Sequence, residues 1–192
     1  MQLYVVQTGE TIWELQQRMD SLAGVSLSEA GRASIEQVAE DLAPHKPTVI
    51  YASQGQAEKE TADLLAAGLG LKVRTESRLD ELDFGLWQGL TISDIRHRQP
   101  KLYKQWLEAP ADLRPPGGES LQEAYKRLSQ AVDEILKKGK KKDKIDAPIL
   151  VLRPTILGVL RCRLERAELD DVWKFVGREF TWKSYEVNEK EF

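Results

Sequence analysis

Short apolar runs alternate along the chain with longer segments in which apolar residues recur every three or four positions. The runs that predict strands cover residues 3–6, 48–52, 71–75, 148–152 and 182–187. The segments whose spacing predicts helices cover residues 33–42, 58–69, 92–106 and 121–136, followed by a stretch that begins at Leu157. Because strands alternate with helices, the pattern predicts an α/β fold, a three-layer sandwich with a mostly parallel central sheet flanked by helices.

The composition fits a globular chain and excludes several classes of function. The 192 residues suit a single domain over 1–192, and a net charge of -3 gives no electrostatic reason to bind nucleic acid or an anionic membrane. No run of about 18 apolar residues is present, so we expect no membrane span. Cys162 is the only cysteine, which rules out an internal disulfide and fits a reducing, cytoplasmic location.

The loops that follow the predicted strands are the places to look for chemistry. In open parallel sheets, ligands bind beyond the carboxyl ends of the strands. The loops after Val6, Ala52 and Leu152 should therefore meet at one edge of the sheet.

Six short segments in and around these loops resemble, in order, the motifs of the histidine phosphatase (phosphoglycerate-mutase-like) family. They cover residues 7–14, 26–32, 52–62, 78–89, 116–120 and 149–155. The fourth retains an Arg-Leu-x-Glu-x-x-Phe-Gly-x-Trp pattern, and the fifth, Pro-Gly-Gly-Glu-Ser, matches without change. The resemblance spans nearly the whole chain and implies the fold predicted above.

The resemblance also implies a particular reaction. In this family a histidine in an Arg-His-Gly motif attacks a phosphoryl group and forms a phosphohistidine, which is covalent catalysis. Two arginines and a second histidine neutralise the phosphoryl oxygens, and a carboxylic acid protonates the leaving oxygen.

Carried over position by position, nearly all of these groups are replaced. The nucleophile corresponds to Thr8, its neighbouring arginine to Gln7, the second arginine to Ala57, and the second histidine and its glycine to Pro154 and Thr155. Glu14 stands where the family has asparagine, and Ser21 and Gly24 depart from a further family motif. Only the acid, Glu81, is retained.

These replacements remove imidazole and positive charge from every matched phosphate-facing position. A phosphate dianion needs charge-assisted donors, and Thr8 would need an adjacent base to act as a nucleophile. The two histidines of the chain, His45 and His97, fall outside the motif loops. The sequence therefore predicts a pseudophosphatase, a catalytically inactive member of the family that serves as a binding or assembly module.

Two alternatives stay open at this point. The chain could carry out acid–base chemistry with Glu81 and Asp80 on a ligand that is not a phosphate monoester, or it could retain phosphatase or phosphoglycerate-mutase activity. For Glu81 we favour a hydrogen-bond acceptor within its own loop. For Arg153, a new cation at the site, we favour an ion pair with Glu14 or Glu81 over a place in the pocket.

The expected site follows from these assignments. We expect Thr8, Ala57, Glu81 and Pro154 to converge at the carboxyl ends of the strands. The expected ligand-binding residues are Gln7, Thr8, Glu14, Glu81, Arg153 and Thr155. We expect no metal and no cofactor; a small-molecule ligand, a protein partner and a homo-oligomer all remain open.

Overall fold

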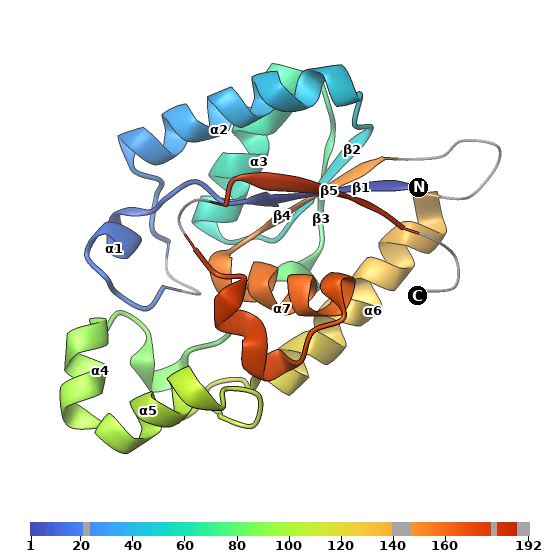
Figure 1. The fold of residues 1–192 in the computed structure, drawn as a ribbon. Coiled ribbons are helices and arrows are strands. Elements are labelled where there is room, and N and C mark those ends of the chain that lie inside the picture. Colours follow the sequence, from blue (N-terminus) through green and yellow to red (C-terminus); the bar gives the residue numbers. More distant parts are fainter. Residues whose placement is uncertain (21–23, 140–146, 178–179, 188–192) are drawn as a thin grey trace.

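A computed structural model of the chain describes residues 1–20, 24–139, 147–177 and 180–187. Its centre is a five-stranded sheet in the order β3-β2-β4-β1-β5 (Figure 1). The strands are β1 (Gln2–Gln7), β2 (Val49–Ala52), β3 (Val73–Thr75), β4 (Pro148–Leu152) and β5 (Trp182–Glu186). The first four pair in parallel, and β5 runs antiparallel to β1. The predicted mostly parallel sheet is confirmed.

The central strands are apolar on both faces, because helices cover both. Along β1, Leu3 and Val5 enter one hydrophobic cluster, while Tyr4 and Val6 enter the other. Successive side chains of a strand point to opposite faces, and β4 follows the same alternation. Buried parallel strands therefore appear in the sequence as the continuous apolar runs from which they were predicted.

Helices form the outer layers of the sandwich (Figure 1). On one face lie α2 (Glu29–Leu42) and α3 (Gln56–Leu69), and on the other lie α6 (Leu121–Gly139) and α7 (Pro154–Glu165). Short 3-10 helices occur at Ala43–His45, Ser77–Leu79, Gly85–Trp87 and Leu169–Lys174. The predicted three-layer arrangement is confirmed. Among the helices of the described ranges, none combines the length and the apolar character that crossing a membrane requires.

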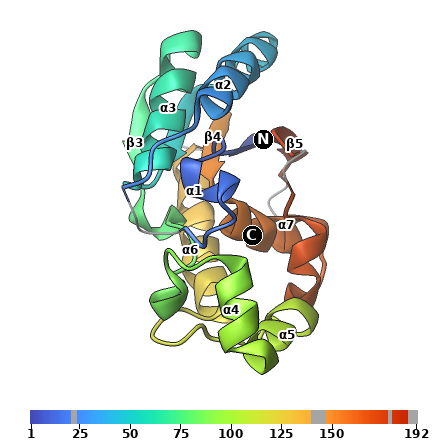
Figure 2. The ribbon, with the colours of Figure 1, turned by 90° about the vertical axis from the view of Figure 1, so that its left-hand side faces the viewer.

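The helices of the structure differ from the predicted ones in number and in some of their first residues. The single helix expected over 92–106 is two helices, α4 (Ile92–Arg98) and α5 (Pro100–Glu108), which lie beyond the sheet on the side of α6 and α7 (Figure 2). Pro100 cannot donate a backbone hydrogen bond and disfavours helical geometry at Gln99, whose φ is -134°. The helix expected from Leu157 begins at Pro154, because proline is well tolerated in the first helical position. The short helix α1 (Ile12–Leu15) was not predicted.

Candidate functional site

The loops that carry the family motifs meet at the carboxyl edge of the sheet. Thr8 follows β1, and its backbone N–H donates to the carbonyl of Leu152 at the end of β4 (3.0 Å). The N–H of Gly9 donates to Oγ1 of Thr61 on α3 (3.1 Å). The N–H of Thr155, on α7, donates to Glu81 in the loop after β3 (2.9 Å). Hydrogen bonds thus join the loops after β1 and β3 to neighbouring elements across this edge.

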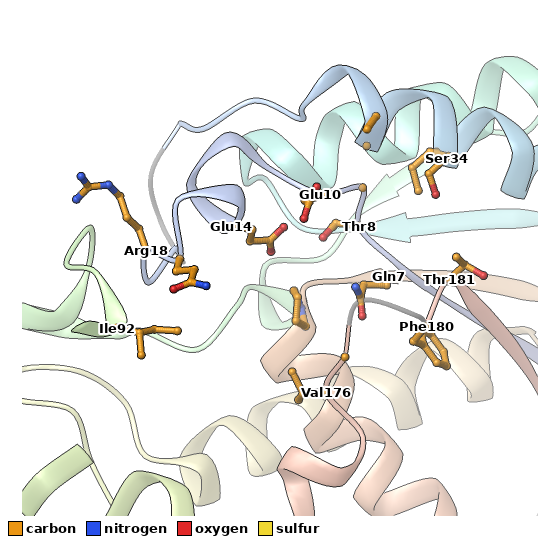
Figure 3. A pocket seen from close by; sticks show the side chains of 17 residues that line it. Gln7, Thr8, Glu10, Glu14, Arg18, Ser34, Ile92, Val176, Phe180 and Thr181 are labelled. Carbon is orange, nitrogen blue, oxygen red and sulfur yellow. The ribbon is translucent and has the colours of Figure 1, made fainter. Parts of the chain in front are cut away.

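Two cavities that share lining residues open at this edge. The larger, about 880 Å³, is lined by Gln7, Thr8, Glu14 and Pro154 among others (Figure 3). The smaller, about 290 Å³, is lined by Glu14, Glu81, Arg153, Pro154 and Thr155 together with apolar side chains. Every expected ligand-binding residue therefore lines at least one of them.

Some positions of the family motifs do not line these cavities or fall outside the described residues. Ala57 sits in the first turn of α3, is 1% exposed and lines neither of these two cavities. Ser21 falls outside the described ranges, and Gly24 is in an exposed loop.

Arg153 is held by carboxylates. It is 2% exposed, and its Nη2 lies 2.9 Å from Oδ2 of Asp20 and 3.3 Å from Oε1 of Glu14. The same nitrogen donates to the backbone carbonyl of Asp20 (3.0 Å). The predicted pairing with Glu14 is present, and Asp20 is a second, nearer partner that was not predicted. The extended backbone of Arg153, with φ -72° and ψ 160°, is the conformation that a following proline favours.

A small polar network fixes the two partners of Arg153. Thr11 caps the N-terminus of α1: its Oγ1 accepts from the N–H of Glu14, and its own N–H donates to Oε2 of Glu14 (2.9 Å). The Oγ1 of Thr11 also donates to Oδ2 of Asp20 (3.1 Å). The Thr-x-x-Glu spacing is the capping-box signature and could have located both α1 and the inward-facing Glu14. No comparable signal marks Asp20, because its partner comes from a distant part of the chain.

Glu81 acts as an acceptor for the start of α7. Its Oε1 accepts from the N–H groups of Leu82 (2.6 Å) and Ile156 (3.0 Å), and its Oε2 accepts from that of Thr155 (2.9 Å). The expected acceptor role is present, but only the bond from Leu82 lies within the loop of Glu81. The other two satisfy orphan donors of a helix N-terminus. Burial raises the pKa of Glu81 to about 7.

The buried charge around Arg153 is mainly negative. Four carboxylates, those of Glu14, Asp20, Glu58 and Glu81, act electrostatically on this one guanidinium. Burial raises the pKa of Glu14 and of Glu58, so removal from water opposes their ionisation. A site built for a phosphate dianion has the opposite balance, with several cations around the anion.

Arg18 and His45, which could add positive charge to the site, are bound elsewhere or point away from it. Arg18 lines both cavities, but its Nη1 donates to the carbonyl of Gly89 (2.8 Å), and its guanidinium points away from Thr8 and Glu14 (Figure 3). His45 packs between Tyr4 and the ring of Trp182 rather than in the site. Within the described part of the chain, no three His, Cys, Asp or Glu side chains are grouped to hold a metal ion.

Solved structures with the same architecture include that of a phosphatase. The structure of the mycobacterial glucosyl-3-phosphoglycerate phosphatase complexed with VO3 superposes with a TM-score of 0.87 at 26% identity, covering 99% of this chain and 93% of that one. Bacillus stearothermophilus YhfR gives a TM-score of 0.88 at 25% identity, covering 98% of this chain and 92% of that one.

Proteins with similar sequences also include a phosphatase and a phosphoglycerate mutase-like protein. Phosphoglycerate mutase-like protein 4 of Arabidopsis thaliana is 34% identical over 169 residues, which are 86% of this chain and 70% of that protein. Phosphoserine phosphatase 1 of Hydrogenobacter thermophilus is 27% identical over 176 residues, 91% of this chain and 81% of that protein. The family model of the histidine phosphatase superfamily (branch 1) matches residues 3–192. The order of the motifs, the fold and these matches agree, and the chain belongs to the histidine phosphatase superfamily.

Proposed function

We propose that this chain is a pseudophosphatase, a member of the superfamily that binds a ligand at the family site without transferring a phosphoryl group. The observation that carries this proposal is the state of Arg153, the buried cation at the site. Asp20 and Glu14 both bind its guanidinium, within 2.9 Å and 3.3 Å. A phosphoryl group that binds Nη2 would have to displace these carboxylates, and one that binds elsewhere on the guanidinium would still share the cavity with their negative charge.

The residue at the nucleophile position supports the same conclusion. Thr8 is 4% exposed, and its Oγ1 has no hydrogen-bond partner within the described residues. A hydroxyl is a weak nucleophile unless an adjacent base, a lowered pKa or a metal ion activates it. The relatives named as phosphatases show what the scaffold supports elsewhere, whereas Gln7 and Thr8 stand here in place of the family's Arg-His pair.

A second candidate function is acid–base chemistry by Glu81 on a ligand other than a phosphate ester. Its pKa of about 7 favours this, because a general acid works best when its pKa is near the operating pH. The geometry opposes it, since three backbone N–H groups occupy the two oxygens of Glu81. Asp80, the other carboxylate considered, lines a different cavity whose Arg127 and Arg114 are paired with Glu119 and Glu123.

A turnover assay tests the proposal directly. The purified full chain is incubated with p-nitrophenyl phosphate and with 3-phosphoglycerate, beside a Thr8→Val variant that lacks the hydroxyl. We expect no difference in rate between the two proteins, and no binding of phosphate or vanadate by isothermal titration calorimetry. Turnover by the natural chain that disappears in Thr8→Val would overturn the proposal and identify Thr8 as the nucleophile.

A further inference from the structure

Carboxylates from the loop after β1 and from α1 line the larger cavity. Glu10 and Glu14 both line it, and the pKa of Glu14 is raised chiefly by burial and also by the nearby charge of Glu10. Thr8 also lines it, and in Figure 3 its hydroxyl faces the carboxylate of Glu14. The polar groups gathered at this point of the wall are therefore acceptors or, in the case of Thr8, can act as one.

Thr8 is the independent indication that a ligand belongs here. Its side chain is almost completely buried, yet its Oγ1 has no hydrogen-bond partner within the described residues. Buried polar atoms in native proteins are nearly always hydrogen-bonded, and each exception calls for an explanation. A ligand that donates a hydrogen bond to Thr8 Oγ1 from the cavity supplies one.

Much of the remaining cavity wall is apolar, beside the polar side chains of Gln7, Gln17, Arg18, Ser34 and Thr181. Ile35, Ile92, Val176 and Phe180 line it, in a space of about 880 Å³ that matches the size of sites for drug-sized molecules. A bare inorganic cation would leave most of this volume and its apolar wall unused. The wall instead fits a molecule with a charged head and an apolar body.

From this geometry we propose that the larger cavity binds an organic cation, an ammonium or guanidinium group carried on an aryl or alkyl body. The cationic head donates to Thr8 Oγ1 and pairs with Glu10 and Glu14, and the body packs on Val176 and Phe180. The inference rests on the proposed function, because it names the ligand class for a site that no longer transfers phosphate. Two carboxylates, Glu10 and Glu14, line the cavity, and the one cation among the described lining residues, Arg18, donates to the carbonyl of Gly89. This balance favours a cation and repels an anion of the same shape.

Three ligands that differ only in the head group test this. Phenethylamine, 2-phenylethanol and 2-phenylethyl phosphate are titrated into the full chain by isothermal titration calorimetry at pH 7.5. We expect the amine to bind at least about tenfold more tightly than the alcohol, and the phosphate to show no binding. Failure of the amine to exceed the alcohol, or preference for the phosphate, overturns the inference.

Two substitutions test whether Glu10 binds the cationic head group. Glu10→Gln keeps the shape of the side chain and should weaken amine binding about tenfold while leaving alcohol binding unchanged. Glu40→Gln, at an exposed position of α2 that does not line the cavity, is the matched control and should change the binding of neither ligand. An equal loss of both ligands in Glu10→Gln would show that the carboxylate only supports the structure and would also overturn the inference.

The two proposals fail separately. If phosphate esters are not turned over but the amine does not bind preferentially, only the ligand class is wrong. If 2-phenylethyl phosphate is hydrolysed, the proposed function is wrong as well.

Discussion

Glu81 shows how one residue can be retained while its surroundings change. Family resemblance places it as a proton donor to a leaving group, yet in this chain its two oxygens accept three backbone N–H bonds. Such bonds favour the ionised form, and burial opposes it more strongly, which leaves the pKa near 7. The carboxyl group therefore changes its charge within the physiological range of pH.

This pKa predicts how stability depends on pH. Because the folded pKa of Glu81 lies above its ordinary value of 4.5, the folded state holds the proton to higher pH than the unfolded state. The free energy of unfolding should then fall as pH rises from about 5 to 7.5, by on the order of 2 kcal/mol from this group. Urea unfolding at several pH values measures the slope.

Two variants test whether Glu81 causes this dependence of stability on pH. Glu81→Gln removes the titration and should flatten the decline, although Glu14 and Glu58, whose pKa values burial also raises, leave part of it. Glu108→Gln, at an exposed position of α5, should leave the slope as it is. An unchanged slope in Glu81→Gln would show that Glu81 is ionised throughout this range.

At the level of elements, the sequence predicts what depends on local pattern. Runs such as 148–152 identify buried strands because both faces are apolar, and helical spacing identifies α2, α3 and α6. Apolar spacing continues through Pro100, so pattern alone joined α4 to α5. In the site, the motif positions could be found from their order along the chain. The interactions of Asp20 and Glu58 with Arg153 could not, because they form only after distant loops meet.

The contact between α2 and the loop after β1 depends on glycine. A Cβ built on Gly31, in the first turns of α2, would lie 2.4 Å from the carbonyl oxygen of Glu10 and 2.7 Å from its nitrogen, both backbone atoms that cannot rotate away. The N–H of Ser28, the N-cap of α2, also donates to that carbonyl (2.8 Å). The entry to α2 thus holds Glu10 at the wall of the larger cavity.

Gly31→Ala should therefore destabilise the fold by about 1–3 kcal/mol, as overpacking does, and should weaken binding to the larger cavity because Glu10 moves. Gly24→Ala is the control, since nothing lies within 4 Å of a Cβ at that position. Chemical denaturation of both variants tests this, and equal stabilities would show that the loop yields without cost.

For the whole molecule, the proposed lack of phosphoryl transfer can be tested by placing the family groups at the matched positions. The combined variant Gln7→Arg, Thr8→His, Ala57→Arg, Pro154→His and Thr155→Gly restores the family groups at the matched positions. We expect it to gain vanadate binding but little or no turnover of p-nitrophenyl phosphate. Glu81 would still cap α7, and Asp20 and Glu14 would still hold Arg153, while Ala57 has little room for a larger side chain.

Calorimetric titration with vanadate and a parallel turnover assay measure the two outcomes. A misplacement of about 1 Å can lower a rate about a hundredfold, so binding can return without catalysis. Substantial turnover would show that a phosphoryl group readily displaces the carboxylates around Arg153.

The three hydrogen bonds to Glu81 also connect two parts of the chain that lie far apart in the sequence. Leu82 lies in the loop after β3, and Thr155 and Ile156 begin α7, yet their amide protons share one acceptor group. Release of that carboxylate exposes all three amides together. In hydrogen exchange they should therefore open as a single cooperative unit, although more than seventy residues of chain separate Leu82 from the helix.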